Sequence, residues 1–292
     1  MFKLYYAPGT CALASHIALE EVGASYTAER LDFKNSQQTS PQYLAINPKG
    51  RVPALVTERG TLTETPAILA YIAQGFPQAR LMPDDAFAFA QAQSFNSYLC
   101  STVHINHAHK MRGYRWAVEE TSFADMKRKV PETMAASFAL IERDMIRGPW
   151  VMGEQYTVCD PYLYTIALWL EGDGVDLAPL PKVAAHRKRM SERPAVQKVV
   201  AEAKAGACRW AKRSVPTITY VALDGGHGAR APLPTLRSGL LRSLLAALHL
   251  AADAEHDVAQ PDRAGVHLRA GRIEHELLVD PGIERWRDRC QR

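Results

Sequence analysis

Cysteine is scarce in this sequence, and the few cysteines present are widely spaced. The chain has 292 residues and five cysteines, at positions 11, 100, 159, 208 and 290. An odd number of scattered cysteines argues against a disulfide framework, and none of the spacings matches a zinc site. Residue 14 is alanine, so Cys11 does not belong to a Cys-x-x-Cys motif, and a dithiol redox cycle is disfavoured there.

Long apolar runs and an excess of charge of one sign are also missing. No run approaches the roughly 18–20 apolar residues that cross a membrane. The 35 basic and 31 acidic side chains nearly balance, which argues against a nucleic-acid partner. The first residues resemble a strand and not a signal peptide, so we expect a cytoplasmic protein without a membrane partner. With 47% apolar residues, the chain can form about two domains.

The last part of the chain lacks residue types that the rest uses freely. Residues 206–292 contain no Phe, Met or Asn, and their single lysine, Lys212, stands against 12 arginines. Residues 1–205 contain 12 arginines and ten lysines. This break predicts a poorly ordered extension from about residue 206. The apolar spacing in Leu240–Ala252 also fits an interaction helix for a partner or a lipid surface. The arginine-for-lysine switch suggests GC-rich DNA read in an altered frame.

Residues 1–80 alternate strand and helix patterns. Apolar segments bounded by Gly and Pro predict strands, and amphipathic spacing predicts the helices between them. The predicted order is β-α-β-α-β-β-α, with strands at residues 4–7, 26–31, 53–56 and 61–63 and helices at 11–22, 41–44 and 66–74. The first two strands form a parallel unit and the last two a hairpin, so we expect a mixed sheet with helices packed on it.

The following segment has long helical patterns separated by Pro and Gly. The predicted helices are 84–118, 125–147, 160–171, 181–190 and 194–203. This pattern predicts an all-helical second domain. Thr157 and Asp160 form a capping box ahead of one helix, with a role in folding, and Cys159 between them is expected to be buried. We therefore expect domains at residues 1–80 and 86–203, ahead of the extension at 206–292.

Cys11 is the first candidate for chemistry. It follows a strand and the turn Pro8-Gly9-Thr10, at the start of the first predicted helix. The backbone N–H groups and the positive dipole end of a helix favour a thiolate, so this position predicts a lowered pKa for Cys11. The alternative is that Cys11 is a small buried hydrophobic residue.

Two segments in the second half of the predicted sheet are candidates for ligand binding. Val52-Pro53 begins a strand, and from the sequence alone a trans bond is expected there; a cis bond would present the backbone groups of Val52. Thr63-Glu64-Thr65-Pro66 leads into a helix, whose N-terminus would accept a carboxylate while Glu64 would take an ammonium group. Taken alone, helix capping by Thr65 is the simpler interpretation.

Basic side chains gather in the predicted helix 84–118, at His104, His107, His109, Lys110 and Arg112. His104 and His107 are three residues apart and therefore share one face. Two such histidines could bind a metal, but no Asp, Glu or Cys joins them locally. A solvated or cleft-lining helix face is the better interpretation.

Together these segments resemble the cytosolic glutathione transferases, and closely the bacterial beta class. The resemblance is carried by residues 3–11 (Lys-Leu-Tyr-Tyr-Ala-Pro-Gly-Thr-Cys), 47–55 (Asn-Pro-Lys-Gly-Arg-Val-Pro-Ala-Leu), 63–68 (Thr-Glu-Thr-Pro-Ala-Ile) and the capping box at 157–160. It covers about residues 1–203. It implies a thioredoxin-like N-terminal domain, an all-helical C-terminal domain, glutathione as co-substrate without a metal, and a homodimer.

The resemblance also implies roles for residues of the first domain. Cys11 would face the glutathione sulfur. Val52 would pair its backbone with the cysteinyl unit of glutathione, with Pro53 in cis. Glu64 and Thr65 would hold the γ-glutamyl group; Thr65 stands where serine is usual and keeps the hydroxyl.

Three further roles follow from the resemblance. Lys34 would lie near the glycyl carboxylate of glutathione. The family's Ser-x-x-His motif matches Ser101 and His104. Because Ile105 replaces the lysine that commonly follows this histidine, His107 is the alternative candidate.

These features predict an enzyme, a glutathione S-transferase that transfers the glutathione thiol to electrophiles in detoxification, with thiol-disulfide exchange through Cys11. One alternative is a non-enzymatic binding protein of the same fold, with a hydrophobic site around Tyr114, Trp116 and Tyr164. Another is a glutathione-dependent isomerase. The electrophile is not readable from the sequence, because the variable helical domain would bind it.

Overall fold

A four-stranded mixed sheet lies at the centre of the N-terminal part. The computed structural model describes residues 1–213, with side chains through residue 203. The strands are β1 (Phe2–Tyr6), β2 (Tyr26–Arg30), β3 (Ala54–Thr57) and β4 (Gly60–Thr63), in the order β2-β1-β3-β4. β1 and β2 are parallel, whereas β3 is antiparallel to both β1 and β4. The predicted mixed sheet is confirmed, with strand ends shifted by one or two residues.

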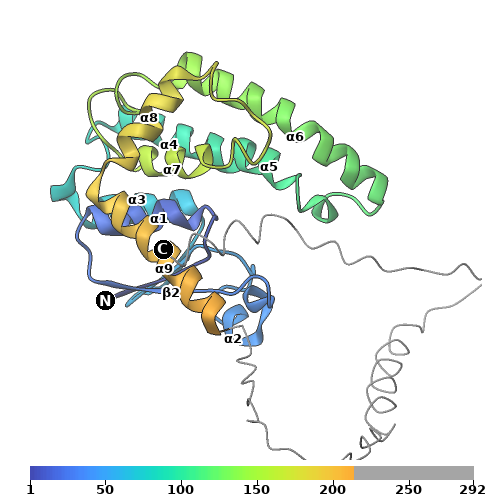
Figure 1. Cartoon of the computed structure of the whole chain (residues 1–292). Helices are drawn as coiled ribbons and strands as arrows, with labels where there is room; N and C mark the ends of the chain where they lie inside the picture. The colour runs from blue at the N-terminus through green and yellow to red at the C-terminus, as the bar shows by residue number, and fades with distance from the viewer. Residues whose placement is uncertain (214–292) are drawn as a thin grey trace, which may run out of the picture. The chain divides into compact units, whose positions relative to one another are not determined.

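Helices pack on this sheet. The elements are α1 (Ala12–Glu21), η1 (Gln37–Thr39), α2 (Pro41–Leu44), α3 (Thr65–Gly75) and η2 (Pro77–Ala79), where η1 and η2 are 3-10 turns. Leu4 and Leu55 of the sheet and Ile68 and Leu69 of α3 are fully buried. Figure 1 shows α1 and α3 between the sheet and the helices α4 to α8 (residues 86–191). The covered face of the sheet therefore joins the core of the helical part.

The rest of the described chain is helical. Its elements are α4 (Ala86–Tyr98), the π-helical η3 (Leu99–Val103), α5 (His104–Ala108), the 3-10 turn η4 (Gly113–Arg115), α6 (Glu120–Leu140), the π-helical η5 (Ile141–Met145), α7 (Cys159–Ala167), α8 (Pro181–Ser191) and α9 (Pro194–Arg213). This arrangement confirms the predicted thioredoxin-like sheet domain followed by an all-helical domain. None of the helices in residues 1–213 has the length and apolar content needed to cross a membrane.

The single predicted helix over residues 84–118 is wrong. The helical run passes through a π-helical segment and ends at Ala108, and the chain then turns before α6. At Gly113 a side chain would meet Phe123 of α6, with the Cβ only 3.0 Å from the Phe123 ring. The packing of the turn against α6 thus outweighs the helical pattern, and it leaves residues 109–119 as a connecting segment.

The last described helix returns to the N-terminal part. Val196 and Val199 of α9 pack with Ile17 of α1, and Arg193 donates to both carboxylate oxygens of Glu21 at 2.6 and 2.8 Å. Figure 1 shows α9 running back along α1.

This helix is longer than predicted. It extends to Arg213, beyond the predicted end at residue 203, and the compact unit spans Met1–Ser214. The boundaries at 80, 86 and 203 stay predictions. The expectations for Leu240–Ala252 and most of the extension lie outside the described residues.

Candidate active site around Cys11

Cys11 sits where the first strand turns into the first helix. Gly9 in the turn has a φ of 73°, a conformation that favours glycine. The Thr10 hydroxyl donates to the Ala7 carbonyl at 2.7 Å and accepts from the Ala12 N–H at 3.4 Å. Cys11 itself is the N-cap of α1 and is only 8% exposed. The turn thus aims the sulfur inward, at the junction of the two domains.

Burial changes the chemistry expected of this sulfur. It raises the pKa of the Cys11 thiol to about 11, while the Thr65 side chain and the positive charge of Arg112 act in the opposite direction. The sequence-based expectation of a lowered pKa at the helix N-terminus is therefore wrong. Desolvation disfavours the charged form more strongly than the helix terminus favours it. Cys11 is a thiol at neutral pH, with a hydrogen to donate.

The Val52-Pro53 bond lies directly beside Cys11. The Cys11 thiol donates to the Val52 carbonyl at 3.5 Å. The bond is cis, so the trans bond expected from the sequence alone is wrong and the cis bond implied by the resemblance is confirmed. Tyr43 and Asn47 both donate to the Arg51 carbonyl, at 2.6 and 2.7 Å, and hold the approach to this bond.

Glu64 and Thr65 occupy the junction between β4 and α3. Glu64 is the N-cap residue, with a φ of 70° that is unusual for a residue with a side chain, and its side chain does not cap the helix. Thr65 is the first helical residue and is 4% exposed. Thr65 is therefore not the N-cap, and the simple capping interpretation is wrong. The Thr65 side chain instead acts to lower the pKa of the Cys11 thiol, against the effect of burial. A strained residue before a helix N-terminus is a common feature of functional sites.

Lys49 is a charged partner at this junction that the sequence reasoning did not single out. Its ammonium group donates to Glu64 Oε1 at 2.6 Å and to the Thr63 hydroxyl at 2.9 Å. The Lys49 and Glu64 side chains are about half exposed. A ligand at α3 would therefore meet an opposite-charge pair and not a lone carboxylate.

His104 and His107 lie on the helical side of the same junction, against Trp169. The ring of His107 stacks on Trp169 at 4.2 Å, and its Nδ1 lies 2.6 Å from the buried Asp173. The ring of His104 lies 5.0 Å from Trp169. The Trp169 indole N–H donates to the Gly9 carbonyl at 3.0 Å. The two histidines thus hold Trp169 against the turn that carries Cys11.

His104 is electrically neutral at physiological pH. Burial lowers its pKa to about 4, and the positive charges of Arg112, Arg115 and Arg51 act in the same direction. His104 therefore offers a neutral imidazole beside Trp169.

Known proteins with this arrangement identify the family. A family model for the glutathione S-transferase N-terminal domain matches residues 1–74. The glutathione S-transferase GstA of Escherichia coli O157:H7 is 32% identical over 198 residues, which are 67% of this chain and 95% of GstA. The chain belongs to the glutathione S-transferase family. The enzyme class predicted from the sequence is thereby confirmed.

Solved structures agree with this assignment. A glutathione transferase homologue from Sulfitobacter, solved with bound glutathione, is 50% identical, covers 69% of this chain and 98% of its own, and superimposes with a TM-score of 0.68. A beta-class transferase of Sphingomonas chungbukensis is 30% identical over 69% of this chain and 98% of its own, with a TM-score of 0.61. The likeness to the beta class is therefore confirmed for the described part of the chain.

The remaining predicted residues of the transferase lie farther from this centre or make other contacts. Lys34 is exposed after β2, where its backbone N–H donates to Asp32 at 3.0 Å. The hydroxyl of Ser101 donates within its own helical run, to the Ser97 carbonyl at 2.8 Å. Tyr164 is buried with Ile17 in the core on the α9 side, so its assignment to the predicted hydrophobic site with Tyr114 and Trp116 is wrong.

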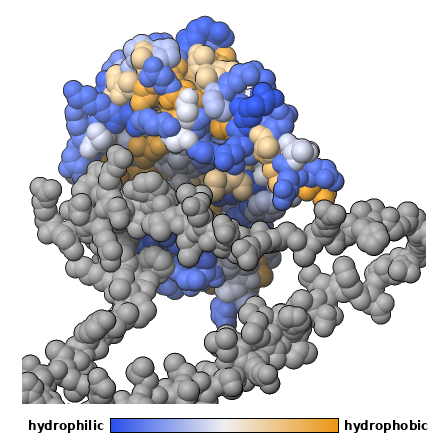
Figure 2. All heavy atoms as spheres, turned by 45° about the vertical axis from the view of Figure 1, so that its right-hand side comes forward, coloured by the Kyte–Doolittle hydropathy of each residue, from blue (hydrophilic) through white to orange (hydrophobic). Residues whose placement is uncertain are grey.

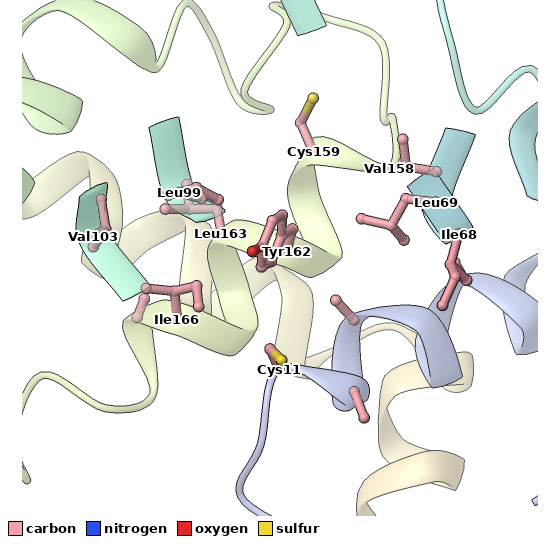
Figure 3. Packing of buried hydrophobic residues seen from close by; sticks show 14 of the residues in the cluster. Cys11, Ile68, Leu69, Leu99, Val103, Val158, Cys159, Tyr162, Leu163 and Ile166 are labelled. Atoms are coloured by element: carbon pink, nitrogen blue, oxygen red, sulfur yellow. The ribbon is translucent and has the colours of Figure 1, made fainter. Parts of the chain in front are cut away.

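The other cysteines of the transferase differ from Cys11 in setting. Cys159 is fully buried, as predicted, and its thiol donates to the Ala92 carbonyl at 3.5 Å. Figure 3 shows Cys11 on one side of Tyr162 and Cys159 on the other. Cys100 is half-buried, and burial raises its pKa. The side chain of Cys208 and all of Cys290 lie outside the described residues.

Sequence reasoning missed the roles of Lys49, Trp169 and Arg112. Lys49 stood inside a recognised motif, and its position before Val52-Pro53 was the available signal. Trp169 and Arg112 reach the site only through tertiary packing. The basic cluster at residues 104–112 contains Arg112 but does not show which of its side chains reaches the site, and no local pattern identifies Trp169.

Proposed function

We propose that this transferase binds glutathione with the glutathione sulfur against Cys11 and transfers the thiol to electrophiles. The observation that supports this most directly is the meeting of Cys11, the Val52 carbonyl and Thr65 at the starts of α1 and α3. Two helix N-termini and a hydroxyl favour a thiolate at this point. The backbone of Val52 would pair with the cysteinyl unit.

The Lys49–Glu64 pair fits the other end of the ligand. The γ-glutamyl group of glutathione carries both an ammonium and a carboxylate on one carbon. Glu64 would accept from the ammonium, and Lys49 and the N-terminus of α3 would hold the carboxylate. Lys34 would approach the glycyl carboxylate. Ser101 and His107 are further candidates for glutathione binding, and glutathione affinity tests all three residues.

The reaction needs glutathione as a thiolate. A free thiol with a pKa near 8.5 is only a few per cent ionised at pH 7, and a shift of about two units requires roughly 2.7 kcal/mol of preferential stabilisation. Because Cys11 keeps its own proton, its S–H can donate to the glutathione thiolate. The thiolate then attacks the electrophile, a carbon–sulfur bond forms, and the leaving group departs with its electron pair.

Cys11 gives the same site a second reaction. In its thiolate form it attacks oxidised glutathione, so that a Cys11–glutathione disulfide forms and one glutathione thiolate leaves. A second glutathione thiolate attacks this disulfide, restores the Cys11 thiolate and yields oxidised glutathione. With a glutathionylated substrate in place of oxidised glutathione, the substrate thiolate leaves in the first step and the same second step follows. The high pKa of Cys11 makes this exchange faster at alkaline pH.

A glutathione-affinity column followed by a conjugation assay tests the proposal. We expect retention on the column and turnover of 1-chloro-2,4-dinitrobenzene. Cys11→Ala is expected to lose disulfide exchange and to retain conjugation, because bound glutathione brings its own sulfur; Cys159→Ala serves as the matched control. Retention without turnover would instead support a non-enzymatic binding protein.

Three finer points belong to the same proposal. We propose that the transferase is a homodimer, acts in the cytoplasm and serves in detoxification. The family supports the dimer, and size-exclusion chromatography with light scattering tests it. A mass equal to one chain would contradict the dimer without affecting the chemistry.

A further inference from the structure

Three arginines, Arg51, Arg112 and Arg115, act electrostatically on His104 at the site. Arg112 follows α5. Its positive charge acts to lower the pKa of Cys11 and repels the charges of Arg115 and Arg51. Burial lowers the pKa of the Arg112 guanidinium, and the neighbouring Arg115 lowers it further. Positive charge is therefore concentrated around His104, and the charge of Arg112 also reaches Cys11.

None of these three arginines forms an ion pair with an acidic side chain in residues 1–203. The acidic side chains nearest the site have other partners: Glu64 pairs with Lys49, and Asp173 pairs with His107 and Lys110. A partly buried cation among like charges lowers stability unless an anion joins it. A site with this composition is suited to a negatively charged ligand.

Apolar side chains adjoin the arginines. Four of the seven large apolar side chains that are exposed in the described residues fall in the short segment between α5 and α6: Met111, Tyr114, Trp116 and Val118. The Arg115 guanidinium lies 5.9 Å from the centre of the Tyr114 ring, and Trp116 contacts His109. On the face shown in Figure 2, apolar patches (orange) lie among hydrophilic surface (blue). The segment thus offers exposed apolar side chains next to the Arg115 guanidinium.

We propose that the electrophile is an aromatic compound with a carboxylate, held by Arg112 and Arg115 with its ring against Tyr114 and Trp116. This inference rests on the proposed transferase function. Glutathione itself has charged partners elsewhere, at Lys49, Glu64 and Lys34. Arg112 and Arg115 come from the helical domain, which faces the sulfur and so the electrophile. A planar guanidinium matches a carboxylate in geometry as well as charge.

A matched pair of electrophiles tests the carboxylate. The compounds 4-chloro-3-nitrobenzoate and 4-chloro-3-nitrobenzamide have the same shape and react in the same way. In both, the glutathione sulfur bonds to the carbon that bears chlorine, chloride leaves with the electron pair, and the thiol proton goes to solvent. The ratio of their kcat/KM values, compared between variants, cancels their intrinsic difference in reactivity.

The expected result is specific to Arg112 and Arg115. Arg112→Gln lowers the ratio of carboxylate to amide kcat/KM about tenfold, and Arg115→Gln lowers it about threefold. Arg112→Lys keeps more of the ratio than Arg112→Gln. Arg59→Gln, at the exposed turn between β3 and β4, is the control and leaves the ratio unchanged. A ratio that Arg112→Gln leaves unchanged overturns the proposal. This includes an equal loss of kcat/KM with both compounds, because Arg112 would then act on the sulfur alone.

Calorimetry separates this inference from the proposed function. The two product conjugates are titrated into the wild-type chain and into Arg112→Gln, together with glutathione. We expect Arg112→Gln to lower the affinity for the carboxylate conjugate about tenfold relative to the affinity for the amide conjugate. A tenfold loss of glutathione affinity in Arg112→Gln would assign Arg112 to glutathione and overturn the inference. The wild-type chain could bind the conjugates with the expected preference and still turn over neither substrate. That result would contradict the proposed transferase activity and support the carboxylate subsite at Arg112 and Arg115.

Discussion

At the scale of single residues, the environment of Cys11 shows why position in the sequence does not decide reactivity. The helix N-terminus and the turn were readable from residues 8–11, and both favour a thiolate. The depth at which the sulfur lies depends on Val52, Thr65 and the helical domain, which come from distant parts of the chain. Burial dominates and raises the pKa. The location of the site was predictable, and its ionisation was not.

Glu64 gives a test of glutathione recognition at this scale. Glu64→Ala should weaken glutathione binding about tenfold, because an ion pair to the γ-glutamyl ammonium is lost. The loss is smaller than the ~2–3 kcal/mol of a charged hydrogen bond in a dry site, since Lys49 already compensates Glu64 and both are half exposed. Isothermal calorimetry measures the affinity, and thermal melting serves as the folding control. Unchanged affinity would remove Glu64 from the site.

His16 gives a pH-dependent prediction. It lies on α1 between the rings of Tyr6 and Tyr26, and its Nε2 has no hydrogen-bond partner in the described chain. Burial lowers its pKa from 6.5 to about 4. Between these values the unfolded chain binds more protons than the folded chain, so stability falls as the pH drops from about 6.5 towards 4.

The expected size is about 1–2 kcal/mol of lost unfolding free energy at pH 5 relative to pH 7. Urea unfolding at the two pH values measures it. His16→Leu should reduce this pH dependence, because the titrating ring is gone and the shared carboxylate contribution remains. An identical pH dependence in the variant would show that His16 does not carry this effect.

At the scale of elements, the start of α7 is the clearest agreement between sequence and structure. Asp160 is fully buried, and its oxygens accept from the N–H groups of Thr157 at 2.7 Å and Val151 at 2.8 Å and contact His186 at 3.0 Å. One half of the predicted capping box is confirmed, because the Asp160 carboxylate accepts from the Thr157 N–H. The other half is wrong, because Val158 is the N-cap and the Thr157 hydroxyl accepts from the Cys159 N–H at 3.3 Å. Asp160 also ties α7 to α8 and to the preceding turn, which the local pattern could not show.

Asp160→Ala should therefore lower the unfolding free energy by about 3 kcal/mol, since several buried donors lose their acceptor at once. Asp176→Ala is the matched control, because exposed Asp176 accepts a single hydrogen bond within the described residues, from the Ala178 N–H. Its expected cost is about 0.5 kcal/mol or less. Denaturant unfolding compares the two variants, and similar losses would contradict the assigned role of Asp160.

Other elements show where periodicity is insufficient. The apolar spacing over residues 84–118 could not reveal the π-helical segment Leu99–Val103 or the turn at Gly113, because both depend on packing against α6 and α7. The composition break near residue 205 also falls inside α9, whose backbone continues to Arg213. A change in residue usage therefore does not predict where a helix ends.

At the scale of the whole molecule, every residue placed at the site lies within residues 1–173. We expect a chain ending after Ser214 to bind glutathione as the full chain does, with a melting temperature within about 2 °C. A chain ending after residue 206 cuts α9 and tests whether its last turns matter. Lost binding in the longer of the two chains would show that the extension belongs to the working protein.

The measurement that tests the central claim most directly is mass spectrometry of the thiols after exposure to oxidised glutathione. Iodoacetamide at pH 7 should modify Cys11 slowly, because its pKa is about 11. Oxidised glutathione should nevertheless modify Cys11 first, and with a rate that saturates in concentration, since the binding site places the disulfide beside the sulfur. An adduct that forms first on Cys100 or Cys159 would contradict the placement of the glutathione sulfur at Cys11.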